Sequence, residues 1–345
     1  MERGGARVAL APLTTLRIGG SAARIAEVVT EADVVDAVRE GREGLFVLGG
    51  GSNVVIGDDG VPGLVARMAM RGIDAKREDG RVVVDVAAGE DWDTLVARAV
   101  DEGWRGVECL SGIPGLVGGT PIQNVGAYGQ EVSETIVSVR VFDRRAGAFA
   151  VVDASDCGFG YRASVFKRSD RWIVTSVRFA FDLADDGAPV RYAELAKALC
   201  VGEGQRAPMR DVRETVLRLR RGKGMVLDPA DPDSVSAGSF FVNPIVDERT
   251  AAEVEVRAGV RPPRFDAGEG KWKLAAAWLV ERAGFVKGWG EGRVGVSRKH
   301  ALALVNRGGA SAAELIAAAR TIRDGVKGRF GVELEPEPVF VGCAW

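Results

Sequence analysis

The sequence is poor in the side chains on which many catalytic and metal sites depend. It contains one histidine, His300, and four cysteines that form no CxxC pair. A serine nucleophile activated by histidine is therefore hard to build, and a zinc or iron–sulfur site is not expected. Four scattered thiols in 345 residues are more typical of a reducing cytoplasm than of a disulfide framework. We expect a cytoplasmic protein without a metal.

An excess of charge of one sign and long apolar runs are also absent. The formal net charge is −2, so the sequence offers no basic surface for nucleic acid. No window approaches the ~20 apolar residues of a membrane span, and residues 1–10 lack the apolar core of a signal peptide. We expect a monomer with no nucleic-acid or membrane partner, in which local backbone N–H groups and a few cations meet any ligand phosphates.

Glycine is abundant, at 46 residues, against a usual share of ~7%. A chain of 345 residues exceeds the usual size of one hydrophobic core. Two or three domains are therefore expected, and shifts in composition favour boundaries near residue 72 and in the Asp- and Pro-rich segment 228–234.

Helices and strands are predicted in a mixed order. Capping boxes at Thr30–Asp33 and Ser311–Glu314 begin two helices, and apolar periodicity predicts others over 91–103 and 271–284. Strands are predicted over 44–50, 81–89, 172–182 and 333–342, and a pair of strands around Ala146–Gly147. The regular alternation of a doubly wound sheet is missing, so the fold class is α+β.

Two glycine-rich loops are candidates for binding a ligand. Residues 48–60, LGGGSNVVIGDDG, lack the lysine of a Walker A loop and the helix of a dinucleotide fingerprint. The sequence is compatible with two interpretations of this loop: a tight structural turn or a concavity that binds phosphate. Residues 111–129 form a longer loop, which is more often functional, and two such loops suggest an extended ligand such as a dinucleotide.

These loops, together with YRASVFK (161–167), AGSFFVNP (237–244) and LEPEPVFVG (334–342), resemble the UDP-N-acetylenolpyruvoylglucosamine reductases. The resemblance runs from about residue 16 to residue 342. It implies an FAD-binding fold of the vanillyl-alcohol-oxidase (PCMH) type in two subdomains, 1–71 and 72–225. A UDP-sugar domain would cover 226–331, and a C-terminal strand, 332–345, can return to the first subdomain.

The resemblance also implies FAD and NADPH as cofactors and the reduction of an enolpyruvyl UDP-sugar to UDP-N-acetylmuramate in peptidoglycan synthesis. The implied FAD-binding residues are Gly49, Gly50, Gly51, Ser52, Asn53, Ser111, Gly112, Ile113, Pro114, Gly118, Gly119, Thr120, Gln123, Asn124, Gly126, Ala127 and Tyr128. The implied substrate-binding residues are Tyr161, Tyr192, Lys223, Asn243, Lys273 and Arg282, where Tyr192 closes on the uridine side as in the longer family type.

Three catalytic residues follow from the same resemblance. Hydride from flavin N5 to the vinyl carbon leaves charge on the substrate carboxylate as an enediolate. Arg162 and Glu337 would stabilise that charge, and Ser239 would donate the proton. Without the motifs, Arg162 reads as a surface ion pair, Ser239 as a turn residue and Glu337 as an edge-strand charge.

Three departures from the family pattern concern ligand contacts. KGMVLDP (223–229) replaces the frequent KLPDP, Pro338-Val339 follows Glu337 where Val-Arg is frequent, and Arg282 replaces a glutamine. Two rivals remain: a different flavin oxidase, which often carries a His or Cys tether, and a non-catalytic nucleotide-binding protein. His300 lies outside the glycine loops, which argues against the first, and the three catalytic residues together argue against the second.

Overall fold

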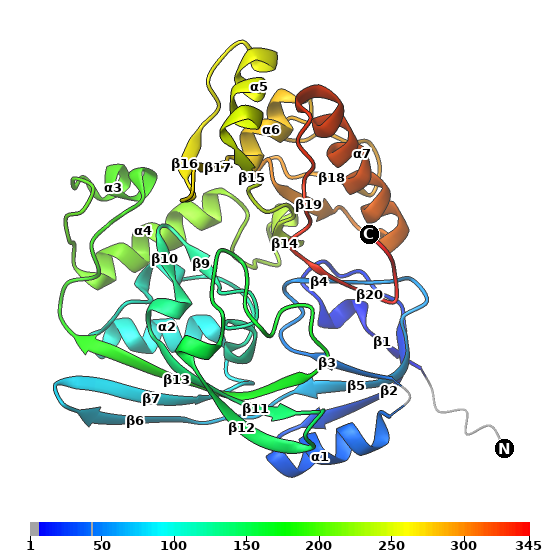
Figure 1. Cartoon of the computed structure of the whole chain (residues 1–345). Coiled ribbons are helices and arrows are strands. Elements are labelled where there is room, and N and C mark those ends of the chain that lie inside the picture. Colours follow the sequence, from blue (N-terminus) through cyan, green and yellow to red (C-terminus); the bar gives the residue numbers. More distant parts are fainter. Residues whose placement is uncertain (1–6, 43) are drawn as a thin grey trace. The chain divides into compact units, whose positions relative to one another are not determined.

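The computed structural model describes residues 7–42 and 44–345, and the chain divides into two compact units (Figure 1). The first unit contains the residues up to Val8, Ala22–Gly51 and Pro62–Gly222. The second contains Ala9–Ser21, Ser52–Val61 and Lys223–Trp345. Each unit is thus built from separate stretches of sequence. The three-part division by residue ranges stays a prediction.

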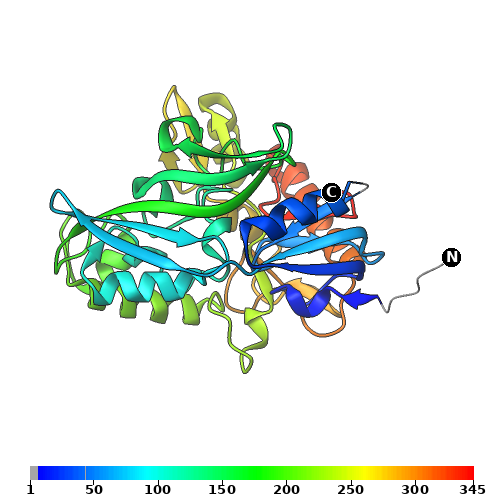
Figure 2. The ribbon, with the colours of Figure 1, turned by 90° about the horizontal axis from the view of Figure 1, so that it is seen from below.

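The largest sheet of the first unit is antiparallel. Its strand order is β12-β11-β13-β7-β6, with β8 paired to β13. The bounds are β6 Ile73–Glu78, β7 Arg81–Ala87, β8 Trp104–Arg105, β11 Ile136–Asp143, β12 Ala148–Asp153 and β13 Trp172–Leu183. Figure 2 shows the long β6–β7 hairpin in cyan. The predicted hairpin turn at Asp79–Gly80 is confirmed, because both residues adopt positive φ, +48° and +78°, as a type I′ turn requires.

A second sheet has the order β1-β2-β5-β3. Its strands are β1 Val8–Ala9, β2 Ser21–Val28, β3 Leu45–Leu48 and β5 Val61–Met68, and β3 pairs with β5 in parallel. Helix α1, Glu31–Glu40, begins at the predicted capping box, in which the Thr30 hydroxyl accepts the Asp33 N–H. The box is confirmed, and Gly41 ends the helix as expected.

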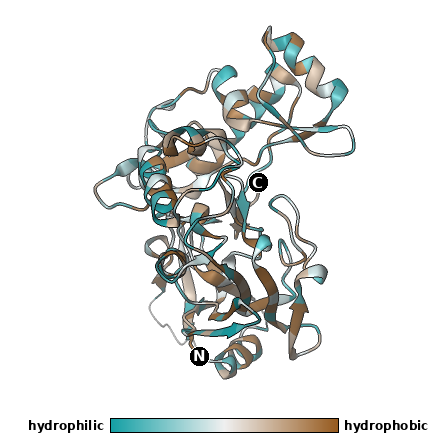
Figure 3. Cartoon of the chain, turned by 90° about the vertical axis from the view of Figure 1, so that its left-hand side faces the viewer, coloured by the Kyte–Doolittle hydropathy of each residue, from teal (hydrophilic) through white to brown (hydrophobic). Residues whose placement is uncertain are grey.

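Three further helices of the first unit are α2 Trp92–Asp101, α3 Ala193–Leu199 and α4 Met209–Gly222. Helix α2 buries its predicted apolar face, and the Trp92 ring lies 6.2 Å from that of Phe179 in β13. In Figure 3 the helices carry both teal and brown residues, as amphipathic helices do. The short strands β9 Gly126–Ala127 and β10 Gln130–Glu131 form a hairpin within the long glycine loop and its exit.

The second unit combines three small sheets with three helices. The sheets are β14-β19-β18, β15-β17-β16 and β20-β4. The bounds are β4 Val54–Ile56, β14 Ser236–Ser239, β15 Ile245–Asp247, β16 Arg264–Asp266, β17 Lys271–Leu274, β18 Val294–Val296, β19 Ala303–Asn306, β20 Val339–Val341, α5 Glu248–Ala258, α6 Ala276–Arg282 and α7 Ala312–Phe330. The part of the chain that the structure describes also contains six 3₁₀ turns: η1 Ala11–Leu13, η2 Glu108–Leu110, η3 Val117–Gly119, η4 Val132–Glu134, η5 Ala154–Asp156 and η6 Pro232–Ser234.

The predicted helix over 271–284 is wrong in its first half. Lys271–Leu274 is the central strand β17, which pairs with both β15 and β16. The alternation Lys-Trp-Lys-Leu has the period of a strand, whereas the alanines that follow favour a helix. The helix therefore begins only at Ala276, and the Asn243 side chain accepts the N–H of that residue at 2.9 Å.

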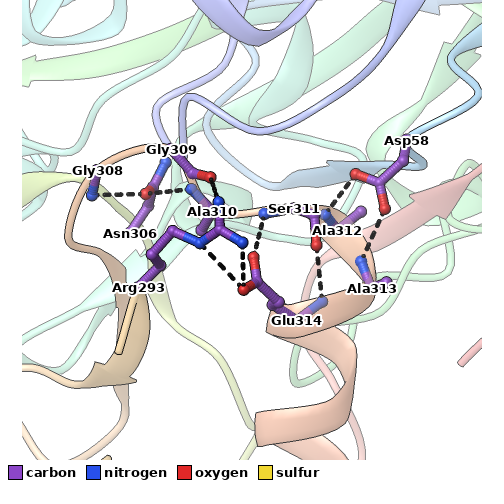
Figure 4. Close-up of polar contacts among 10 residues, drawn as sticks. All are labelled: Asp58, Arg293, Asn306, Gly308, Gly309, Ala310, Ser311, Ala312, Ala313 and Glu314. Carbon is purple, nitrogen blue, oxygen red and sulfur yellow. Dashed lines mark hydrogen bonds and ion pairs between the residues drawn. The ribbon is translucent and has the colours of Figure 1, made fainter. Parts of the chain in front are cut away.

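Helix α7 begins at a network of polar contacts (Figure 4). The predicted capping box is confirmed, since the Ser311 hydroxyl accepts the Glu314 N–H and the Glu314 carboxylate accepts the Ser311 N–H. Asp58, which lies 254 residues earlier than Ala312, accepts the N–H groups of Ala312 and Ala313 at 2.7 and 3.0 Å. The start of α7 is therefore capped twice, once locally and once by a distant loop.

We expect Asp58→Ala to lower the free energy of unfolding by about 0.5–2 kcal/mol, because two N–H groups of the first turn lose a charged acceptor. Thermal and urea unfolding would measure the change. Asp59→Ala is the matched control, since Asp59 is the neighbouring acid and is also exposed. Equal stability of the two variants would contradict the capping role.

None of the helices within residues 7–42 and 44–345 is long and apolar enough to cross a membrane.

Candidate active site

Residues 48–51 of the first glycine loop lie against the long glycine loop in the first unit. A Cβ atom on Gly50 would stand only 2.6 Å from the Gly115 Cα, so these backbones touch where no side chain fits. At Gly49 and Gly119, in contrast, nothing lies within 4 Å of the place a Cβ would take. The backbone is therefore uncovered at Gly49 and Gly119 and closely packed at Gly50. A flat or extended group can lie directly on the uncovered main chain. This shape fits the pyrophosphate and ring of FAD.

Asp93, near the start of α2, fixes the beginning of the long glycine loop. Its carboxylate accepts the Gly112 N–H at 2.6 Å and two bonds from the Arg213 guanidinium of α4, at 2.6 and 2.9 Å. Burial opposes the charge of Asp93, but the bonds from Arg213 and Gly112 outweigh it and lower the pKa of Asp93. Asp93 is thus ionised at neutral pH and ties the loop to two helices.

Asn124 organises the end of the same loop from within. It is almost fully buried and adopts a positive φ of +45°. Its carboxamide donates to Glu131 at 2.7 Å and to the Gly160 carbonyl at 3.1 Å, and accepts the Ser133 N–H at 3.1 Å. These bonds give Asn124 a structural task, whether or not it also contacts FAD as predicted.

Arg162 is joined to this loop by its guanidinium. Nη2 donates to the Gly126 carbonyl at 2.6 Å and Nη1 to the Asn124 carbonyl at 3.3 Å. The residue itself has φ +53°, an uncommon conformation for arginine, and its guanidinium also lies 5.3 Å from the centre of the Tyr161 ring. The orientation of Arg162 is therefore set by the backbone of the loop predicted to hold FAD.

Two tyrosines meet beside the loop. The Tyr128 and Tyr192 rings are 5.5 Å apart and nearly perpendicular. Burial raises the pKa of Tyr128 to about 12, so its phenol stays protonated at neutral pH. The segment before Tyr192 is anchored by the buried Glu108, whose carboxylate accepts the Ala188 N–H at 2.6 Å and a bond from Gln130 at 2.9 Å. The predicted uridine-side tyrosine thus packs on a predicted FAD residue.

Ser239 ends strand β14 in the second unit and is half-buried. Gly238 before it has φ +74° and lies in an irregularity of the β14–β19 pairing, a conformation that favours glycine. Phe240 and Phe241 after it are 1% and 2% exposed and pack edge to face at 5.2 Å. The two rings are core residues that fix the backbone on the C-terminal side of Ser239.

Glu337 is brought to this segment by backbone pairing. The Glu337 N–H donates to the Phe240 carbonyl at 2.8 Å, and the Val242 N–H donates to the Glu335 carbonyl at 3.0 Å. Glu335 is exposed, whereas Glu337 is half-buried. The structure therefore joins the segments of two predicted catalytic residues, Ser239 and Glu337, and gives the two neighbouring glutamates different environments. Arg162 belongs to the other unit.

The remaining predicted substrate residues lie on several elements. Lys223 directly follows α4 and is half-buried, and Asn243 holds the start of α6. Lys273 is in β17, 5.9 Å from the centre of the Phe265 ring, and Arg282 is exposed at the end of α6. His300 accepts the Leu302 N–H through Nδ1 at 2.9 Å.

Sequence reasoning missed two long-range side-chain contacts of the second unit, and one of them reaches the Ser239 segment. The Thr15 hydroxyl donates to the Ser236 carbonyl at 2.6 Å, and the Asn306 amide donates to the Leu16 carbonyl at 2.9 Å. No local pattern marks either residue, because the partners are more than two hundred positions apart in the chain. Among the residues that the structure describes, no group of three or more His, Cys, Asp or Glu could hold a metal ion.

Comparison with known proteins finds matches over most of the chain. Residues 22–151 match the family model described as FAD binding domain, and residues 229–341 match that of the UDP-N-acetylenolpyruvoylglucosamine reductase C-terminal domain. The reductase of Thermobifida fusca is 52% identical over 97% of both chains, and that of Mycolicibacterium gilvum is 49% identical over 98% of this chain and 96% of the relative.

The fold is shared as well. The crystal structure of the reductase from Thermus caldophilus matches with a TM-score of 0.67 at 27% identity, over 97% of this chain and 98% of the other. The predicted α+β fold with an FAD-binding domain is confirmed. With half of all positions identical along nearly the whole length, this chain belongs to the UDP-N-acetylenolpyruvoylglucosamine reductase family.

Proposed function

We propose that this protein reduces UDP-N-acetylglucosamine enolpyruvate to UDP-N-acetylmuramate, with FAD as bound cofactor and NADPH as the reductant. The observation that carries the proposal is the bond from the Glu337 N–H to the Phe240 carbonyl, which joins the backbone of Glu337 to the residue after Ser239 in a chain whose only histidine holds a turn. That pair suits proton delivery to a carbanion better than attack by a nucleophile.

The reaction needs a hydride at the terminal vinyl carbon and a proton at the carbon next to the substrate carboxylate. FAD, when bound, supplies the hydride that NADPH provides. The protein's part is to orient the substrate, to stabilise the negative charge that spreads onto the carboxylate, and to deliver the proton. The two glycine loops would hold FAD, and the residues 226–331 would bind the UDP-sugar as a separate domain.

Arg162 and Glu337 would stabilise the developing charge. A guanidinium is permanently charged and can contact both oxygens of a carboxylate, and the carbonyls of Asn124 and Gly126 already orient that of Arg162. Glu337, either protonated or sharing a proton through water, would donate a hydrogen bond to the enediolate. An ionised Glu337 would instead repel the intermediate.

Ser239 would donate the proton. A serine hydroxyl is a weak acid, so the transfer requires a strongly basic carbon and nearby stabilisation of the charge left on oxygen. The hydroxyl gives its proton to the carbon next to the carboxylate and regains one from solvent. The buried pair Phe240 and Phe241 supports this role, because it limits the movement of the backbone that carries the hydroxyl.

An anaerobic absorbance experiment tests the proposal. The purified protein is first reduced with NADPH, and the enolpyruvyl UDP-sugar is then added while the visible flavin band is followed. We expect bleaching in the first step and rapid return of the band in the second. A protein that binds FAD but is not reoxidised by the sugar would be a nucleotide-binding protein only. Parallel assays with NADH would measure how the protein discriminates between the two reductants, and sedimentation would test the expected monomeric state.

A further inference from the structure

Asn53 holds the chain on both sides of Pro338. Its backbone carbonyl accepts the Val339 N–H at 3.0 Å, and its side-chain Nδ2 donates to the Glu337 carbonyl at 3.3 Å. Asn53 directly precedes strand β4, which pairs in parallel with β20 from Val54 opposite Val339 onward. The side-chain bond therefore extends the β4–β20 ladder past a residue that has no N–H of its own.

Both the backbone N–H and the backbone carbonyl of Glu337 are thus hydrogen-bonded. Its N–H donates to the Phe240 carbonyl at 2.8 Å, and its carbonyl accepts the Asn53 carboxamide. Pro338 restricts Glu337 to extended backbone conformations. Of these three restraints, only the Asn53 bond comes from a side chain, and only it can be removed without changing the chain around Glu337.

We propose that Asn53 is a positioning residue for Glu337, so that the glycine loop 48–60 orients a catalytic acid in addition to its expected contact with FAD. For the catalytic part the inference rests on the proposed function. The reason is geometric: the backbone of Glu337 carries its carboxyl, so rotation of the 337–338 peptide would displace that carboxyl. Loss of the bond should therefore lower kcat more than it weakens FAD binding.

Two variants separate the side chain from the fold. Asn53→Ala removes the donor, and Asn53→Asp keeps the size but sets a carboxylate against the Glu337 carbonyl. We expect kcat to fall about 10-fold in the first and about 100-fold in the second, with FAD content near that of the parent protein. Thr15→Val is the matched control in the same unit, because the Thr15 hydroxyl donates to the Ser236 carbonyl at 2.6 Å and to the Ser52 carbonyl at 3.5 Å, and neither bond reaches Glu337.

A double-mutant cycle with Glu337→Gln identifies the route. If Asn53 acts through Glu337, Asn53→Ala should cost little further activity in the Glu337→Gln background, whereas Thr15→Val should cost the same in both. The kcat pH profile gives a second readout. The pH-dependent limb that disappears in Glu337→Gln should shift along the pH axis in Asn53→Ala and stay at the parent position in Thr15→Val. Additive effects for Asn53, or a loss confined to FAD affinity, would overturn the proposal.

Hydrogen exchange of the FAD-loaded protein tests the contact without any turnover. Backbone exchange in the peptide 335–341 should become faster in both Asn53 variants and remain unchanged in Thr15→Val. Unchanged exchange in the Asn53 variants would refute the positioning role even if the reductase activity is confirmed. Faster exchange in a protein that does not reduce the UDP-sugar would instead refute the proposed function and leave the contact standing.

Discussion

Ser239→Ala is expected to slow the formation of UDP-N-acetylmuramate by about 10³-fold or more, while the reduction of FAD by NADPH proceeds at nearly the parent rate. The estimate follows from the usual contribution of a positioned proton donor. The hydroxyl can be removed with little effect on the fold, since the Phe240 N–H still donates to the Leu302 carbonyl at 2.8 Å and both phenylalanines stay buried. Anaerobic stopped-flow absorbance of the two half-reactions makes the measurement.

Ser239→Cys is the informative companion variant. A thiol keeps a proton donor at nearly the same place, so part of the activity lost in the alanine variant should return. Deuterated solvent should slow the second half-reaction of the parent protein and leave the first unchanged. Equal slowing of both half-reactions in Ser239→Ala would remove the proton-donor role and point to a structural one.

Arg162→Lys is the second variant with a large expected effect. A lysine keeps the positive charge. Because it lacks the planar guanidinium, it cannot donate to the Asn124 and Gly126 carbonyls and at the same time make two hydrogen bonds to a carboxylate. We expect kcat to fall about 10²-fold, in the range found when one donor to a developing anion is lost. FAD content should remain close to that of the parent, which flavin absorbance against protein absorbance would check.

Arg168→Lys provides the control for Arg162→Lys. Arg168 is exposed and lies six positions later in the same segment, and it also has a positive φ, +56°. The same exchange there should change kcat little. If the two variants lose activity equally, the effect would arise from the segment 161–168 as a whole and not from contact of Arg162 with substrate.

Local signals predicted the elements that local chemistry determines. The capping boxes at Thr30 and Ser311 and the turn at Asp79–Gly80 act over a few residues, so the sequence alone located them. The strand at Lys271–Leu274 was missed because its pairing with β15 and β16 overrides the helix preference of the alanines that follow. Helix α4 was also missed, although Val212 and Val216 are spaced as on one buried face.

In the candidate site, too, the sequence predicted local features but not the long-range contacts. Separate sequence motifs identified Ser239 and Glu337 as candidates. The backbone hydrogen bond that joins their two segments is a tertiary contact, and neither motif predicts it. The contact of Asn53 with Glu337 spans 284 positions, and that of Thr15 with Ser236 spans 221. Such partners are chosen by the packed fold, so the sequence could predict the chemical groups but not the residues that hold them in place.

The pairing of β4 with β20 has a consequence for how the protein is made. On the ribosome, residues 52–61 emerge early, yet their partner strand Val339–Val341 and the helix start that Asp58 caps are synthesised hundreds of residues later. The whole sequence of the first unit, which ends at Gly222, has been synthesised well before that point, but the second unit cannot close until strand Val339–Val341 has been made. Long-range pairing of this kind is intrinsically slow. Glu337 therefore comes into place only in the closing steps of folding, when the loop 111–129 of the first unit can already have formed.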